Sequence, residues 1–174
     1  MASLLLTECK HAKRDVNQLF IQENGYIPAA EIRHFKAYYT LKGDVALVLQ
    51  APVMKDYSNY DFQTQIFPSG VDILIKNRND NGHTRVQADK AVLYKQTELT
   101  ELIGNVKITG EKGESLTTGR LFWDRQNEHL FTDSHVRFQR GDEYIEGTGF
   151  DSNMRFSNAR VNNVEGVFHI KTGK

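Results

Sequence analysis

The segment Leu116-Thr117-Thr118-Gly119-Arg120-Leu121-Phe122-Trp123 decides the fold, because its pattern occurs three times along the chain. Residues 86–93 match it at a spacing of 30 residues, and residues 145–150 repeat its first part after 29. Residues 102–108 match residues 132–138, again at a spacing of 30. A repeat of this length that holds two strands is typical of stacked strand pairs, in which each pair covers the apolar face of the one before. The repeat therefore predicts a chain of successive strand pairs.

Each copy of the motif carries the same irregularity. Leu116 and Thr118 are followed by Leu121 and Trp123, so one step between apolar-facing positions spans three residues instead of two. One extra residue is what a β-bulge supplies, because it keeps both ends of a strand facing one side while the strand bends. Bulges at equivalent places curve a sheet repeatedly in one direction. We therefore predict a jelly roll or flattened β-solenoid in preference to a flat sandwich.

Short alternating runs continue through most of the chain from about Ile32 onward. Residues 45–49 and 71–75 alternate with a period of two, which is typical of strands with one buried face. Turn-forming residues separate the runs, and these connections are too short for crossover helices. The turn segments are residues 40–43, 79–82, 110–113 and 140–142. We predict an all-β fold, a twisted open β-jellyroll of about ten antiparallel strands over residues 26–172.

Composition excludes several classes of protein. The 174 residues hold 22 Lys and Arg against 22 Asp and Glu, with 39% hydrophobic residues. This balance lacks the basic excess that neutralises phosphates in nucleic-acid binding, and also the high net charge of disordered chains. The length fits one domain with its own core. A single cysteine, Cys9, cannot form a disulfide within the chain, so disulfide chemistry says nothing about the compartment.

The N-terminal region, residues 1–25, lies outside the repeat. Its apolar run Leu4-Leu5-Leu6 is far shorter than the roughly 20 residues that a transmembrane helix needs. Leu6-Thr7-Glu8-Cys9 loosely resembles a lipoprotein cleavage site, which would make Cys9 a lipid anchor, although Glu8 stands where a small residue is expected. The region is then a linker or the remnant of a signal or anchor segment, with residues 10–20 as a short helix or linker. The alternative is a frayed N-terminus with a free thiol.

Motifs for catalysis and metal binding are missing from the sequence. The six histidines form no His-x-His or His-Glu-x-x-His pattern, and Cys-x-x-Cys cannot occur with one cysteine. Glu128-His129 with His135 does not reproduce the ligand spacing of the cupin enzymes, which are also jelly rolls. Neither a Gly-x-Ser-x-Gly elbow nor a phosphate-binding loop occurs. We expect no catalytic residue, no metal, no cofactor and no enzymatic activity.

Several short motifs resemble a known family when their order and spacing are taken together. The chain from Thr40 to about Ile170 resembles the LptC family of lipopolysaccharide export proteins in its Bacteroides-like form, within the OstA/LptA-like jellyroll superfamily. The matching pieces are Thr40-x-x-Gly43, Ala51-Pro52-x-Met54 with Tyr57, Phe67-Pro68-x-Gly70, Ala88-x-x-Ala91, Leu102-x-Gly104-Asn105-Val106, Gly113-x-x-Leu116-x-Thr118-x-x-Leu121-x-Trp123-Asp124, Thr132-Asp133 with Val136, Gly147-x-Gly149-Phe150, and Gly166. The chain departs from the family pattern at Gly119, where an acidic residue is expected, and in its incomplete N-terminal anchor.

The resemblance implies a function and a location. It implies a periplasmic jellyroll held at the inner membrane of a Gram-negative cell by an N-terminal anchor that is absent or incomplete in this chain. Such a protein accepts lipopolysaccharide from an inner-membrane ABC transporter and passes it to an LptA-like jellyroll protein, toward the outer membrane. Docking would use the strand edges at the two ends of the roll. An exposed sheet edge is independently a template for another chain's strand, including a second copy of this chain.

The apolar face of the strands is the candidate lipid-binding groove. Each buried methylene contributes about 0.8 kcal/mol, so acyl chains bind such a lining without a dedicated polar site. The alternative is that these side chains only fill a core. The candidate groove residues are Val71, Ile73, Ile75, Val86, Ala88, Leu102, Val106, Ile108, Leu116, Leu121, Trp123, Val136, Phe138, Ile145 and Phe150.

Three basic residues of opposite parity, Lys107, Arg120 and Arg137, are candidate contacts for lipid phosphates. The alternative interpretation is that these three residues simply lie on a solvated outer face, which is the usual place for alternating charges on half-buried strands.

Two other function classes remain open from the residues themselves. A carbohydrate-binding or adhesive β module predicts aromatic rings on the outer face, whereas a protein-only scaffold predicts edge docking without lipid. Trp123 has the inward parity of Leu121, which favours an interior position over a sugar-binding platform.

Overall fold

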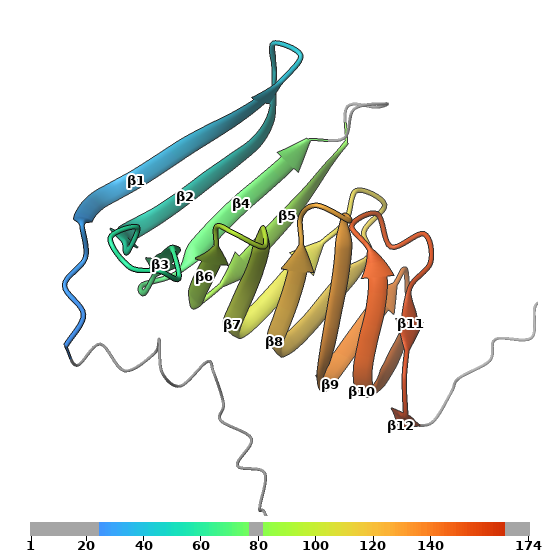
Figure 1. The fold of residues 1–174 in the computed structure, drawn as a ribbon. Helices are drawn as coiled ribbons and strands as arrows, with labels where there is room; N and C mark the ends of the chain where they lie inside the picture. Colours follow the sequence, from blue (N-terminus) through green and yellow to red (C-terminus); the bar gives the residue numbers. More distant parts are fainter. Residues whose placement is uncertain (1–24, 77–81, 166–174) are drawn as a thin grey trace, which may run out of the picture.

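The computed structural model describes residues 25–76 and 82–165, and every regular element within these ranges is a β-strand (Figure 1). The predictions for Cys9, for residues 10–20 and for most of the turn at 79–82 lie outside the described residues. The strands are β1 (Ala30–Leu41), β2 (Asp44–Asp56), β3 (Thr64–Phe67), β4 (Val71–Lys76), β5 (His83–Ala88), β6 (Lys90–Tyr94), β7 (Leu99–Thr109), β8 (Ser115–Asp124), β9 (His129–Arg140), β10 (Glu143–Asn153), β11 (Arg160–Val161) and β12 (Val164–Glu165).

All twelve strands belong to one antiparallel sheet, in the order β11-β10-β9-β8-β7-β5-β4-β2-β3-β6. Strand β1 pairs with β2, and β12 pairs with β10. Strand β7 also pairs with β6, so its first half has β6 as neighbour and its second half has β5. The sheet therefore folds over on itself and encloses a core, which confirms the predicted open β-jellyroll. The two extra strands are two-residue pieces that follow β10.

The predicted bulges are present in two of the three copies of the motif. The pairing register shifts between Thr118 and Phe122 in β8, and between Thr148 and Phe150 in β10, where Gly149 has a φ of 93°. In the third copy the inward facing of Val86, Ala88 and Ala91 is as predicted, but the prediction of a bulge within one strand is wrong, because residues 86–93 are divided between two strands. Strand β5 ends at Ala88 and β6 begins at Lys90, so the chain changes partner at Asp89.

Asp89 is fastened to the bulge of the neighbouring strand β7. Its backbone N–H donates to the carbonyl oxygen of Gly104 at 2.9 Å, and Asn105 Nδ2 donates to its carboxylate at 2.7 Å. Gly104 has a φ of 74°, and a Cβ atom built there would lie 2.7 Å from Asp89 Oδ2. The Leu102-x-Gly104-Asn105 motif thus has a structural reason, since only glycine allows both this backbone conformation and this approach.

The predicted tight turns agree with the structure wherever it describes them. Lys42 and Gly43 both have positive φ values, 54° and 94°, in the two-residue turn between β1 and β2. Positive φ at both central residues is the signature of a type I′ hairpin turn, which matches the twist of the strands it joins. The turn after β9 is equally short, and Gly141 has a φ of 62° there.

The main core lies between the two halves of the folded sheet. It contains aliphatic and aromatic residues from β2 to β10, together with Met154 and Phe156 from the segment after β10. A second, smaller cluster of Tyr57, Ile66 and Val92 lies apart from it. Val92 follows the main-core residue Ala91 in β6, so this cluster lies on the outer face of the sheet. Tyr60, from the β2–β3 loop, packs against it.

Asp56, the last residue of β2, fastens this loop to the sheet. Its carboxylate accepts hydrogen bonds from Lys95 Nζ at 2.9 Å, Gln65 Nε2 at 3.1 Å and the Ser58 backbone N–H at 2.8 Å. Burial by itself raises the pKa of Asp56, but these donors outweigh it and lower the pKa to about 2. The folded chain therefore binds the Asp56 proton more weakly than the unfolded chain does.

Acid is expected to weaken the fold through Asp56. A pKa lowered from 3.8 to about 2 stabilises the folded state above pH 4, and this contribution disappears as the pH falls from about 4 to 2. Urea unfolding of Asp56→Asn at pH 7, 4 and 2.5 should show a smaller loss on acidification than the parent chain, by about 1–2 kcal/mol. Equal losses in the two proteins would contradict this role for Asp56.

Candidate functional site

The candidate groove residues gather on the inner face of the sheet. Thirteen of the fifteen are buried, most of them with almost no exposed surface. Of the other two, Ile75 in β4 is partly exposed and Ile145 in β10 is exposed. Trp123 is also inside the core, as its parity predicts, so it does not form an exposed sugar platform.

This interior is closed over β7 to β9 and over β10 beyond Ile145, but it opens along the β1–β2 hairpin. Leu49 and Ile75 pack against the core and remain only partly buried, as does Leu47. Tyr39, directly opposite Leu47 and so on the same face, is 58% exposed. Figure 1 shows why, because β1 and β2 reach beyond the rest of the sheet at this end, and none of the strands in residues 25–76 and 82–165 lies across from them. The apolar lining is therefore continuous from a closed core to an uncovered end.

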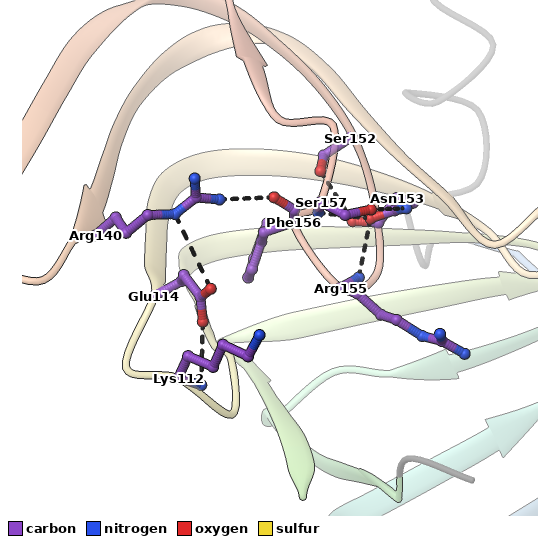
Figure 2. Close-up of polar contacts among 8 residues, drawn as sticks. All are labelled: Lys112, Glu114, Arg140, Ser152, Asn153, Arg155, Phe156 and Ser157. Atoms are coloured by element: carbon purple, nitrogen blue, oxygen red, sulfur yellow. Dashed lines mark hydrogen bonds and ion pairs between the residues drawn. The ribbon is translucent and has the colours of Figure 1, made fainter. Parts of the chain in front are cut away.

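The other end of the roll is closed by the segment that follows β10. Phe156 is fully buried and packs on Phe138 and Phe150, with ring centroids 5.3 and 6.2 Å away. Arg140 donates from Nη2 to the carbonyl oxygen of Phe156 at 2.8 Å, and its Nε lies 4.0 Å from Glu114 Oε1 (Figure 2). The side chain of Asn153 holds the same turn, since its Oδ1 accepts from the backbone N–H of Ser157 at 3.1 Å.

Sequence reasoning missed several core residues that the structure brings into this interior. Phe67 and Leu130 belong to the main core, although neither was a candidate groove residue. Alternation along β9 from the buried Thr132 identifies Leu130 as an inward-facing residue. Phe156 lies outside any alternating run, so no local signal identifies it.

The three basic candidates lie on the outer face but in different surroundings. The Nη1 atom of Arg137 lies 3.2 Å from Glu146 Oε1. The Cζ atom of the same guanidinium lies over the ring of Tyr144, 3.8 Å from the ring centroid. Lys107 is exposed and lines a shallow hollow of about 570 Å³ with His83, Arg85, Gln87 and Glu111 among others. Arg85 is itself paired with Asp72.

Arg120 has a different environment, because it pairs with a buried carboxylate. Its Nη2 and Nε lie 2.6 and 2.8 Å from Glu101 Oε1, and Glu101 is almost completely buried. The hydroxyl of Tyr94 donates to the other oxygen of Glu101 at 2.9 Å. Burial, the negative charge of Glu101 and the hydrogen bond to it raise the pKa of the Tyr94 phenol. Arg120 thus compensates a carboxylate beside the outer cluster, which sequence reasoning did not predict.

The two edges of the sheet differ. Among the described residues, the twelve-residue strand β1 pairs on one side only, with β2. Tyr38 and Tyr39 are both exposed near the end of this strand. At the other edge, β10 is partly covered by β11 and β12. In the part of the chain that the structure describes, the fold therefore presents one long uncovered edge strand and one covered edge.

Chemical and membrane features are few in the part of the chain that the structure describes. Its His, Cys, Asp and Glu residues form no group of three or more that could hold a metal ion. None of its elements is a helix of the length and hydropathy needed to cross a membrane.

The fold and its interior define a class, a curved antiparallel β-jellyroll with an apolar lining that opens at one end. The family model for "Lipopolysaccharide-assembly, LptC-related" matches residues 28–169. The chain belongs to this LptC family, as its motifs suggested, and its role is in lipopolysaccharide transport. The family consists of periplasm-facing transport proteins and is not known for catalysis. A comparison with curated proteins gave no match.

Proposed function

We propose that this protein is a non-enzymatic bridge that accepts lipopolysaccharide from an inner-membrane ABC transporter and relays it across the periplasm toward the outer membrane. An N-terminal anchor within or before residues 1–25 would hold it at the inner membrane. The observation that carries the proposal is the apolar interior that opens along the β1–β2 hairpin, where Leu47, Leu49 and Ile75 remain partly exposed.

Acyl chains fit this lining by the hydrophobic effect alone. Each methylene that leaves water contributes about 0.8 kcal/mol, so several acyl chains bind without directional polar contacts. Sugars and phosphates stay in water at the lip of the roll. Lys107 is the best placed of the three basic candidates for a phosphate, because Arg120 and Arg137 already pair with Glu101 and Glu146. Binding that depends on hydrocarbon burial also suits a carrier that must release its cargo.

The uncovered edge of β1 supports docking of a neighbouring protein. Main-chain N–H and C=O groups on a bare edge can form a ladder with an added strand, and exposed apolar side chains beside it add specificity. Tyr38 and Tyr39 supply such side chains, one on each face of β1. We place the inner-membrane transporter on this edge, because β1 also borders the open end through which lipid would enter.

A photo-crosslinking comparison tests lipid entry at the hairpin. Leu49 faces the interior, whereas its neighbour Val48 points to the outer face of the same strand, and both are partly buried. A photo-reactive amino acid at position 49 should capture lipopolysaccharide in cells that make it, with a yield at least several times that at position 48. The yield is read as a shifted band that an antibody to lipopolysaccharide recognises.

Position 48 is the matched control, since it differs from position 49 by one residue and by the face it occupies. Equal yields at the two positions, with both proteins folded, would contradict an interior path for the lipid. Capture at position 48 alone would place the lipid on the outer face.

A further inference from the structure

We propose that residues 160–165 form a displaceable cover on strand β10, and that this cover prevents a second copy of the chain from adding its β1 strand there. A repeat fold with two uncovered sheet edges can pair one edge with the opposite edge of another copy. Such head-to-tail contacts are heterologous, so the stacking continues without limit. Here one edge, β1, is uncovered among the described residues, whereas the other carries strands from its own chain. Self-stacking is therefore blocked at β10.

The cover is weakly held. Strands β11 and β12 have two residues each and form four register pairs along the eleven-residue strand β10. Between them, the Asn162 backbone N–H donates to the carbonyl oxygen of Gly149 at 2.9 Å, whereas the Thr148 backbone N–H reaches the carbonyl oxygen of Asn163 only at 3.4 Å, and Asn163 has a φ of 40°. Apart from Val161, every residue of the cover is exposed. Few buried apolar contacts and solvent-exposed backbone hydrogen bonds are features of segments that open locally.

Charge also opposes the cover. Glu165 lies directly opposite Glu146 in the register, and like charges at directly opposite positions destabilise a strand pair. Glu146 has Arg137 as a partner at 3.2 Å, which lessens the repulsion on its own side of the pair. Glu165, the last paired residue of the cover, is therefore the residue whose pairing is most easily lost.

The part of β10 before the cover offers a starting point for an incoming strand. No strand in the described part of the chain pairs with residues 143–145 on that side, and Tyr144 and Ile145 are 50% and 37% exposed. An incoming β1 can form its first pairs there and then replace β12 and β11 in turn. β1 has twelve residues against eleven in β10, so the two edges match in length.

Gly147 provides a selective way to remove the cover. A Cβ atom at this position would lie 2.6 Å from the carbonyl oxygen of Asn162 and 2.9 Å from that of Asn163, both in the cover. The φ of Gly147 is not positive, so alanine is conformationally acceptable there. Gly119 in β8 is the matched control, because a Cβ atom there meets nothing within 4 Å. Val164→Pro, at an exposed position of β12, weakens the cover by a second route.

The test measures the mass of the purified, lipid-free protein by light scattering over a range of concentrations, and amide hydrogen exchange in residues 158–165. Gly147→Ala and Val164→Pro should exchange at least tenfold faster in the cover and form concentration-dependent oligomers. The parent chain and Gly119→Ala should remain monomeric. Glu165→Lys, which replaces the like-charged pair with an opposite-charged one, should slow exchange in the cover about threefold to fivefold.

A second arm identifies the partner edge. Adding Tyr38→Glu and Tyr39→Glu to Gly147→Ala places carboxylates on both faces of β1, and it should return the protein to monomers. Cover-displaced variants that stay monomeric overturn the proposal, as does association that persists with both tyrosines replaced. Exchange in the cover that remains slow in both Gly147→Ala and Val164→Pro overturns its displaceability. The assay contains no lipopolysaccharide, so its outcome is independent of the proposed lipid path.

Discussion

Val106→Asp is expected to destabilise the protein by about 3–5 kcal/mol, because it places an unpaired carboxylate inside the core. Val106 is 1% exposed, and its register partner Thr118 in β8 is also buried. A loss of this size lowers the melting temperature by about 10 °C in a domain of this length. Thermal unfolding followed by circular dichroism at a β-sheet wavelength measures the shift.

Lys107→Asp is the matched control for Val106→Asp, since it introduces the same side chain one residue further along β7. Lys107 is exposed on the outer face, so the change in stability should stay within about 0.5 kcal/mol. The control also separates two roles, because Lys107→Asp should weaken lipopolysaccharide binding if Lys107 contacts a lipid phosphate. Similar losses of stability in the two variants would contradict the assignment of the two faces.

Arg120→Leu is expected to cost about 2–4 kcal/mol, because it leaves the carboxylate of Glu101 buried without its positive partner. The value lies toward the lower end of the range for fully buried pairs, since the Arg120 side chain is 31% exposed. The hydrogen bond from Tyr94 remains, but a phenol does not neutralise a charge. Urea unfolding at pH 7 gives the free energy of unfolding for this variant.

A second substitution separates charge compensation from every other role of Arg120. Glu101→Gln keeps an acceptor for Tyr94 and removes the charge, so Arg120→Leu combined with Glu101→Gln should recover at least half of the lost stability. A combined variant no more stable than Arg120→Leu would contradict the ion-pair explanation. If the combined variant also binds lipopolysaccharide as the parent chain does, Arg120 is not a phosphate contact.

The curvature of the fold was predictable from residue spacing, because a bulge leaves a local mark in the sequence. The three-residue step at 118–121 and 147–150 locates real register shifts in β8 and β10. The same step at 88–91 instead marks a change of strand at Asp89. Spacing cannot separate these outcomes, since the difference depends on the carbonyl of Gly104 and the amide of Asn105 in another strand.

The inner face was predictable for the same reason, whereas the outer cluster and the closed end were not. A glutamate in an alternating strand is expected to face solvent. Glu101 is instead buried beside the outer cluster that contains Val92. Burial there follows from long-range packing, including Tyr94 and Arg120 from two flanking strands. Phe156 shows the same limit, since it enters the core from an irregular segment with a positive φ of 55°.

The neighbour relations within the sheet also bear on the order in which the chain folds. Strands β7, β8, β9 and β10 are consecutive in the chain and adjacent in space, joined by connections of five, four and two residues. Short closures of this kind carry a small entropic cost, so we expect this meander to form first. The β1–β2 hairpin joins the remaining sheet through four register pairs with β4 and two with β3. The end at which we propose that lipid enters is thus expected to be the last part of the sheet to become ordered and the first to open.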